Sequence, residues 1–188
     1  MENNLSKSYW LPNTTNYMID FETLDTTPTA LILSLGICRF DKHGPDDKFY
    51  VEFNRHQSDR TVSEATIVWW TAQGNIPTGA TDLDYGIRDA LVFMDSHRYN
   101  PGDSIEVWAK GTDFDIVIFN NILQQLKLKP VWRYNAVSDM RTLKKYNSDI
   151  ILPYVNLNSH NALEDAMYQA YTTMHILNCL DRRAGHDN

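Results

Sequence analysis

The stretch Tyr17-Met18-Ile19-Asp20-Phe21 is predicted to form a short β-strand, and the fold follows from the segments around it. Leu31 to Phe40 is more continuously apolar and predicts a second strand. A turn is predicted at Lys42-His43-Gly44-Pro45, and a third strand at Lys48-Phe49-Tyr50-Val51-Glu52-Phe53. We expect these three strands to pair as an antiparallel meander.

The rest of the chain alternates between segments with helical periodicity and short apolar segments typical of strands. Helices are expected at about residues 64–73, 83–94, 114–126, from 140 onward and 162–180, and strands at 105–109 and 132–134. Gly74 is placed to end the first helix, and Thr81 is placed to cap the second. After Asp181 the chain is polar and is expected to fray.

This order of elements predicts an α/β fold: a mixed sheet of three antiparallel strands followed by parallel strands, with helices on both faces. The chain has 188 residues, 43% of them hydrophobic, which fits one domain over residues 1–188 with polar ends at about 1–16 and 182–188. Cys38 and Cys179 lie far apart without CxxC spacing. We therefore predict no zinc site and no disulfide framework, and expect both to be buried thiols.

Composition also narrows the choice of partners. No apolar run approaches the roughly 20 residues needed to cross a bilayer, and the first 16 residues lack the apolar stretch of a secretory signal. We therefore expect a cytoplasmic protein with no membrane partner.

The net charge of −7 argues against a broad basic face for nucleic acid, because Lys and Arg normally neutralise the phosphates. Cations held by clustered carboxylates could still attract phosphate locally, since they reverse the charge of the site.

Asp20 and Glu22 form the first candidate metal-binding group. Residues two apart in a strand point to the same side, so both carboxylates would project together from the end of the first strand. Composition alone predicts an Asp-x-Glu match about 0.6 times in this chain, and two solvated charges are the ordinary alternative. The pair alone therefore identifies no site.

A second acidic group follows the strand expected at 105–109. There the sequence Trp108-Ala109-Lys110-Gly111-Thr112-Asp113-Phe114-Asp115 predicts a glycine turn that leads into a helix. We expect Asp113 to cap this helix and Asp115 to be the free carboxylate. The alternative is that both acids only complement the helix dipole.

The third group is His160 with Asp165. Side chains five residues apart on a regular helix differ in direction by about 140°. Asn161 followed by Glu164 is a variant of the capping box, so we expect Asn161 to be the cap, His160 to precede the helix and Asp165 to lie in its first turn. Both side chains could then reach one site. The spacing is also expected by chance about 0.6 times, and a lone His before a helix is more often an ordinary surface residue.

In this order, the three groups resemble the motifs of the DEDD exonuclease superfamily, in the subclass with a catalytic histidine (DEDDh). The resemblance covers nearly the whole chain, through IDFETLDT at 19–26, WAKGTDFDIVIFNNIL at 108–123 and SHNALEDA at 159–166. Within the superfamily the chain is most similar to the phage and bacterial branch of exonuclease VIII and the short 3′-to-5′ exonucleases and exoribonucleases, as segments 65–73 and 138–143 also indicate. It departs at Ala109 and Lys110, where small or Asn-like residues are typical.

The resemblance implies a ribonuclease-H-like fold and a 3′-to-5′ exonuclease that hydrolyses the terminal phosphodiester of DNA or RNA and releases nucleoside 5′-monophosphates. By the same resemblance, the metal-binding acids are Asp20, Glu22, Asp115 and Asp165, and His160 is the catalytic histidine. Oxygen ligands without thiolate favour Mg²⁺ or Mn²⁺, and two such ions about 4 Å apart can clamp the attacking and leaving oxygens. His160 would then take a proton from the attacking water as general base.

Candidate substrate contacts also follow. Thr23 and Leu24 match positions whose backbone usually faces the terminal nucleotide, and Trp69, Trp70 and Phe114 are further candidates. Adjacent residues on a helix point about 100° apart, so at most one tryptophan is expected to stack on a base, and core packing is the alternative for each. Six basic residues could guide the strand toward the metals or form a solvated face: Lys127, Lys129, Arg133, Arg141, Lys144 and Lys145. Arg141 could instead pair with Asp139 or another acid.

Two other functions compete with the nuclease. A catalytically inactive nucleic-acid-binding or protein-binding module on the same fold would not need the intact acids and histidine. A phosphohydrolase with an Asp nucleophile leaves His160 and Asp165 without roles. The sequence does not choose between DNA and RNA. The expected partner is a nucleic acid with a free 3′ end, single-stranded or frayed, in the host cytoplasm if the protein is phage-encoded, and the family resemblance also allows a homodimer.

Overall fold

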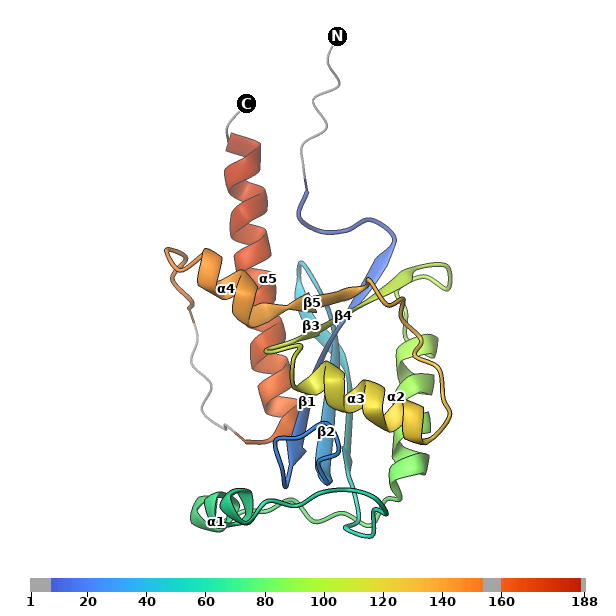
Figure 1. Ribbon diagram of the computed structural model, residues 1–188. Helices are drawn as coiled ribbons and strands as arrows, with labels where there is room; N and C mark the ends of the chain where they lie inside the picture. The colour runs from blue at the N-terminus through green and yellow to red at the C-terminus, as the bar shows by residue number, and fades with distance from the viewer. Residues whose placement is uncertain (1–7, 154–159, 187–188) are drawn as a thin grey trace.

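The computed structural model describes residues 8–153 and 160–186, so Ser159 of the last motif and the outermost residues of both polar ends lie outside the described part. A five-stranded sheet with the order β3-β2-β1-β4-β5 runs through the centre (Figure 1). Its strands are β1 (Thr14–Thr23), β2 (Ile32–Asp41), β3 (Gly44–Glu52), β4 (Ser104–Ala109) and β5 (Val137–Asp139).

The pairing confirms the expected mixed sheet. Strands β1, β2 and β3 are antiparallel neighbours, whereas β4 pairs parallel to β1 and β5 parallel to β4. Thus the first strand of the chain lies in the middle of the sheet, where the antiparallel and parallel halves meet. The acidic pair that it carries is therefore central.

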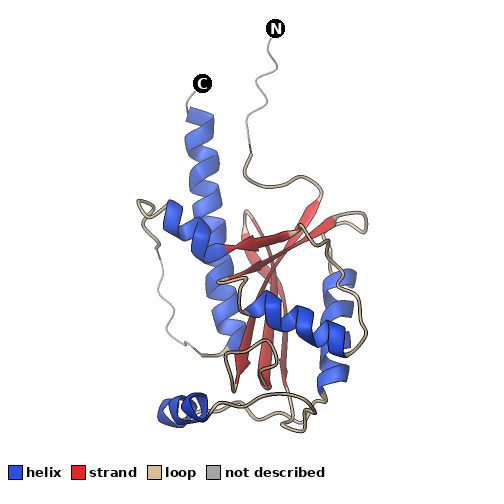
Figure 2. Cartoon of the chain, in the orientation of Figure 1, coloured by secondary structure: helices blue, strands red, loops and turns tan. Residues whose placement is uncertain are grey.

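Helices cover both faces of the sheet (Figures 1 and 2). They are α1 (Glu64–Gln73), α2 (Leu83–Ser96), α3 (Asp115–Gln125), α4 (Met140–Tyr146) and α5 (Ala162–His186). The long α5 contacts β1, β2 and β3 on one face, and α2 and α3 pack on the opposite face. None of the helices in the described part of the chain is long and apolar enough to span a bilayer.

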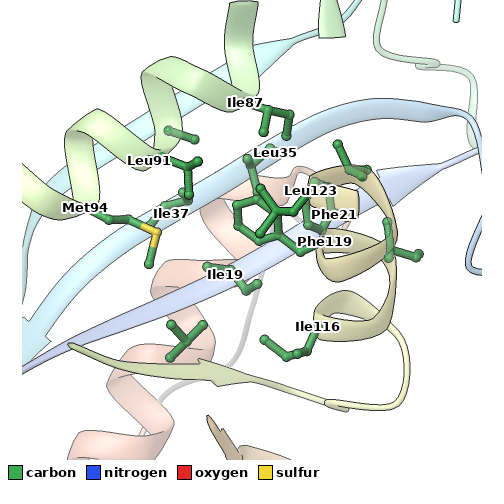
Figure 3. Packing of buried hydrophobic residues seen from close by; sticks show 14 of the residues in the cluster. Ile19, Phe21, Leu35, Ile37, Ile87, Leu91, Met94, Ile116, Phe119 and Leu123 are labelled. Carbon is green, nitrogen blue, oxygen red and sulfur yellow. The ribbon is translucent and has the colours of Figure 1, made fainter. Parts of the chain in front are cut away.

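Strand alternation decides which side chains reach which face. Ile19 and Phe21 point into the larger hydrophobic core, where they pack against α2 and α3 (Figure 3). Met18 points the other way, into a smaller core that includes Ala166 and Ala170 of α5. Because side chains two apart share a face, the acids two and four residues after Met18 lie on the α5 side.

The short fifth strand corrects one prediction. The strand expected at 132–134 lies instead at Val137–Asp139, and Trp132 is a buried core residue whose ring centroid lies 5.2 Å from that of Phe119. An aromatic residue such as Trp132 is typical of a strand, but here its burial comes from packing against α3.

Helix ends differ from the predictions in three places. Asp82, not Thr81, caps α2, because its side chain accepts a 2.9 Å hydrogen bond from the Asp84 amide. Phe114, not Asp113, is the residue before α3. At the other end of the chain α5 continues to His186, past the point where fraying was expected, and Cys179 on this helix is half-buried rather than buried.

Candidate active site

Asp20 and Glu22 project from β1 toward α5. Both are half-buried, and a register irregularity in the β1–β2 pairing follows directly between Glu22 and Thr23. The predicted strand therefore places both carboxylates on one face, near the point where the regular pairing of β1 ends.

Asp115 is brought to the same place by the turn between β4 and α3. The turn closes with a hydrogen bond from the Phe114 amide to the Gly111 carbonyl, and Asp115 then starts the helix. Its buried carboxylate accepts a 3.0 Å hydrogen bond from the backbone amide of Phe21. This bond fixes the start of α3 against β1, beside the acidic pair.

His160 and Asp165 meet at the start of α5. The Asn161 side chain accepts hydrogen bonds from the amides of Leu163 and Glu164, each 3.1 Å, so Asn161 caps the helix as expected. The amide of His160 donates a 2.7 Å hydrogen bond to Oδ2 of Asp165. His160 has a φ of 71°, so the backbone reverses before the helix and overcomes the unfavourable five-residue spacing.

The start of α5 can approach the sheet because β2 carries a glycine there. Gly36 pairs with Asp20 across β1 and β2, and a Cβ at position 36 would lie 2.3 Å from the Ala162 carbonyl. This close approach brings Asp165 toward Asp20. Gly36 was not among the predicted site residues, although a lone glycine within a strand signals close backbone approach.

Together these groups surround one cavity of about 250 Å³, which we call the acidic cavity. Its lining residues are Asp20, Phe21, Glu22, Lys110, Gly111, Phe114, Asp115, Arg141, His160, Asp165 and Gln169. Within it, one possible ligand atom each of Glu22, His160 and Asp165 lies within 4.8 Å of the other two. The structure thus brings all four predicted acids and the histidine together, although they lie as far apart as positions 20 and 165.

The pKa values of three of the four acids are raised. Burial, followed by repulsion from Asp115, Glu22 and Asp165, raises the pKa of Asp20 well above its usual range. Burial and repulsion from Asp165 and Asp115 raise the pKa of Glu22 to about 8, and burial raises the pKa of Asp115 to about 7. Such a cluster is costly when ionised and can be relieved either by protons or by cations.

Gln169 is a second residue that sequence reasoning missed. It lies on α5, one turn after Asp165, and its amide nitrogen donates a 2.6 Å hydrogen bond to Oδ1 of Asp20. The spacing of four residues from Asp165 was the available signal, since residues four apart share a helix face.

The predicted substrate residues border a neighbouring cavity of about 340 Å³. Thr23, Trp69, Trp70 and Phe114 line it, whereas Leu24 does not. Trp70 is buried and donates a 2.9 Å hydrogen bond from Nε1 to the Thr23 carbonyl, so it belongs to the core. Trp69 is 40% exposed, and its ring lies edge-to-face with that of His160 at a centroid distance of 4.6 Å.

The backbone at Thr23 and Leu24 is already engaged within the protein. The Thr23 carbonyl accepts the Trp70 bond, the Leu24 amide donates to the Leu31 carbonyl at 2.8 Å, and the Leu24 carbonyl accepts from the Ser63 amide at 2.8 Å. Both side chains are also buried, so three of the backbone groups that the resemblance assigned to substrate contact are occupied within the protein.

Of the six basic residues singled out in the sequence, Arg141 lines the acidic cavity, together with Lys110. Arg141 also lies 3.9 Å from Asp113, in a pair that is exposed on both sides, which agrees with the alternative that it pairs with an acid other than Asp139. The other five do not line this cavity.

Comparison with known proteins gives a family match. The model of the 3′-5′ exoribonuclease Rv2179c-like domain matches residues 15–177. An exodeoxyribonuclease of Enterobacteria phage T4 is 24% identical over 142 residues, which cover 66% of this chain and 60% of that protein. The chain thus spans about three fifths of this curated relative.

Solved structures show the same fold at low sequence identity. E. coli exonuclease I in complex with a dT13 oligonucleotide is 12% identical with a TM-score of 0.69, over 92% of this chain and 43% of that one. A 3′-exonuclease that recognises the 3′ end of a histone mRNA stem-loop is 16% identical with a TM-score of 0.66, over 95% of this chain and 67% of the other. A zinc-bound form of E. coli exonuclease I with single-stranded DNA has a TM-score of 0.69 at 12% identity, over 92% of this chain and 42% of that one.

Proposed function

Because the chain belongs to the 3′-5′ exoribonuclease Rv2179c-like domain family, we propose that it is a metal-dependent 3′-to-5′ exonuclease. In this reaction the terminal phosphodiester is hydrolysed and a nucleoside 5′-monophosphate leaves. The observation that carries the proposal is the convergence of Asp20, Glu22, Asp115, Asp165 and His160 on the acidic cavity.

The donor set fits hard divalent cations. The four acids offer only carboxylate oxygens, no cysteine lines the cavity, and burial raises the pKa values of Asp20, Glu22 and Asp115, so a bound cation would relieve the cost of ionising them. Such ligands suit Mg²⁺ or Mn²⁺. When bound, a pair of these ions would neutralise the acids and stabilise charge on the attacking and leaving oxygens of the phosphodiester.

His160 is the proposed general base. Its ring lies within reach of the carboxylates of Glu22 and Asp165, and the hydrogen bond from its amide to Asp165 holds its backbone in place. The imidazole would take the proton of the attacking water. The Trp69 ring lies edge-to-face with the imidazole at a centroid distance of 4.6 Å, and this contact limits the positions that the imidazole can adopt.

The remaining residues around the two cavities would bind the end of the strand. Lys110 and Arg141 supply positive charge beside the acids, where the phosphate would lie. Trp69 and Phe114 offer aromatic surface to the terminal base in the neighbouring cavity, while Thr23 lines the same cavity. This arrangement needs an unpaired 3′ end, so we propose single-stranded or frayed DNA or RNA as the substrate.

The deciding experiment uses 5′-labelled DNA and RNA oligonucleotides with Mg²⁺, Mn²⁺ or a chelator. Wild type should shorten the label-bearing strand stepwise from its 3′ end only when metal is present, and Asp20→Ala should leave it intact. The relative rates on DNA and RNA give the sugar preference. A wild-type protein that binds both oligonucleotides but shortens neither would favour the inactive binding module.

A further inference from the structure

Three of the four acids have one carboxylate oxygen held by a protein hydrogen bond. Oδ1 of Asp115 accepts from the backbone amide of Phe21 at 3.0 Å, and Oδ2 of Asp165 accepts from the backbone amide of His160 at 2.7 Å. Oδ1 of Asp20 accepts at 2.6 Å from a side chain, the amide of Gln169. A hydrogen bond to one oxygen restricts the rotation of the carboxylate.

Gln169 differs from the other two donors because it can be replaced without altering the backbone. The residue is only 2% exposed, and its Oε1 is buried with no hydrogen-bond partner among the described residues. A buried acceptor without a partner is destabilising, and an apolar side chain of similar size would avoid that cost. Core packing alone therefore does not explain a glutamine here.

The orientation of the Gln169 amide follows from the charge beside it. A carboxylate that binds a cation is ionised and only accepts hydrogen bonds, so in that state the NH₂ group has to face Asp20 and the carbonyl oxygen has to face away. The unpaired Oε1 is the consequence of placing a donor beside Asp20. Gln169 Oε1 therefore stays without a hydrogen bond among the described residues while the amide nitrogen holds the Asp20 carboxylate.

We propose that Gln169 is a positioning residue that holds Asp20 as a one-oxygen ligand and thereby sets the cation preference of the acidic cavity. This inference rests on the proposed function, because it concerns the same acids. Mg²⁺ and Mn²⁺ suit ligands that each supply one oxygen in a near-octahedral arrangement, whereas Ca²⁺ readily accepts both oxygens of one carboxylate. Without Gln169, Asp20 is free to rotate and to offer both oxygens.

The chain supplies a matched control on the same helix. Thr173 lies one turn beyond Gln169, is fully buried, and has a hydroxyl oxygen without a partner among the described residues. It does not line the acidic cavity. Thr173→Val therefore removes a buried unpaired oxygen from α5 without touching the acids.

The test measures the binding of Mn²⁺ and of Ca²⁺ to chelator-treated protein by isothermal titration calorimetry. Wild type, Gln169→Met, Gln169→Asn and Thr173→Val are compared, with circular dichroism to verify the fold. Met keeps the length of the side chain without its donor, and Asn keeps the amide on a shorter side chain, so either variant that folds carries the test. The loss of a partner that orients a metal ligand typically lowers affinity by about 10- to 100-fold.

We expect both Gln169 variants to bind Mn²⁺ about 10- to 100-fold more weakly, to lose less affinity for Ca²⁺, and to recover turnover at high Mn²⁺ with an unchanged KM for the oligonucleotide. Thr173→Val should bind both ions as wild type does. Wild-type Mn²⁺ affinity in a folded Gln169 variant, or equal losses for both ions, would overturn the positioning role alone. Failure of wild type to bind Mn²⁺ would overturn the proposed function as well.

Discussion

Gly36 of β2 lies against Ala162 at the start of α5, so close that a Cβ on Gly36 would come 2.3 Å from the carbonyl carbon and oxygen of Ala162. The same glycine is the β-sheet partner of Asp20. The contact therefore sets the distance between the acids of β1 and the first turn of α5, which carries Asp165.

Replacing Gly36 with Ala should push the start of α5 away from the sheet. We expect a loss of about 1–3 kcal/mol in the free energy of unfolding, from forced movement of backbone, measured by urea denaturation. Activity should fall by about 10²-fold, since a displacement near 1 Å can have that effect. Gly102→Ala is the control, because nothing lies within 4 Å of a Cβ there. Equal activity in the two variants would contradict the role given to this contact.

Replacing His160 with Ala should slow the chemical step without removing the metal site. The expected fall in kcat is about 10²- to 10⁴-fold, the usual contribution of a general base, with Mn²⁺ affinity close to that of wild type. Single-turnover kinetics and calorimetry measure the two quantities. His56→Ala, at an exposed position outside the acidic cavity, should change neither. Loss of Mn²⁺ binding in the His160 variant would make His160 a metal ligand instead of a base.

Substitutions of the two adjacent tryptophans should have different effects, one on stability and the other on substrate binding. Trp70→Phe removes the donor to the buried Thr23 carbonyl and should lower the free energy of unfolding by about 1–3 kcal/mol. Trp69→Ala removes a half-exposed ring beside His160 and should raise KM for the oligonucleotide with little change in stability. Urea denaturation and steady-state kinetics on both variants check this division, and a reversed pattern would refute it.

The stability of the metal-free protein should fall as pH rises. Unfolded Glu22 and Asp115 lose their protons near the ordinary values of 4.5 and 3.8, whereas the folded pKa values are about 8 and about 7. Between these limits the folded state binds more protons than the unfolded state, so the free energy of unfolding decreases with pH across this window. The Tm of chelator-treated protein should therefore be higher near pH 5.5 than near pH 8.5.

Cations should reverse this trend, because they bind the ionised acids of the folded state. The rise in Tm on addition of Mn²⁺ should be larger at the higher pH. Asp115→Asn removes one of the titrating groups and should flatten the pH dependence of the metal-free protein. An unchanged slope in that variant would show that Asp115 does not contribute to it.

Much of the fold could be predicted from the periodicity of hydrophobic residues. The first three strands and α5 were predicted from their apolar patterns, and the structure confirms that these elements form. Strand β5 has only the residues Val137, Ser138 and Asp139, too few for alternation to show, and it exists because the exposed edge of β4 offers hydrogen bonds. Local propensity does not contain that information.

The residues before α2 and α3 lie one position later than predicted, for different reasons. Asp82 competes with Thr81 and takes the role through its bond to the Asp84 amide. Asp113 instead points toward Arg141, a residue distant in sequence. The first cap is therefore chosen by a local hydrogen bond, and the second difference accompanies a contact between residues distant in sequence.

The site residues were predicted from motifs, whereas their supports were not. Asp20 and Glu22 follow from strand alternation, and the placement of His160 before the helix follows from the Asn161 cap. Gly36 and Gln169 carry no charge that draws attention, and their importance appears only when β2, β1 and α5 are seen to meet. Motifs identify reactive groups, but not the uncharged residues that hold them in position.

The acidic cavity takes its groups from the first strand and from the start of the last helix, and this ordering bears on protein synthesis. A ribosome exposes β1 long before it has produced α5, and an intermediate that lacks α5 has neither Asp165 nor the cover for one sheet face. Nascent chains stalled before Ala162 should therefore leave labelled oligonucleotides uncut. The proposed activity would then begin only after the last helix has been synthesised and has packed on the sheet.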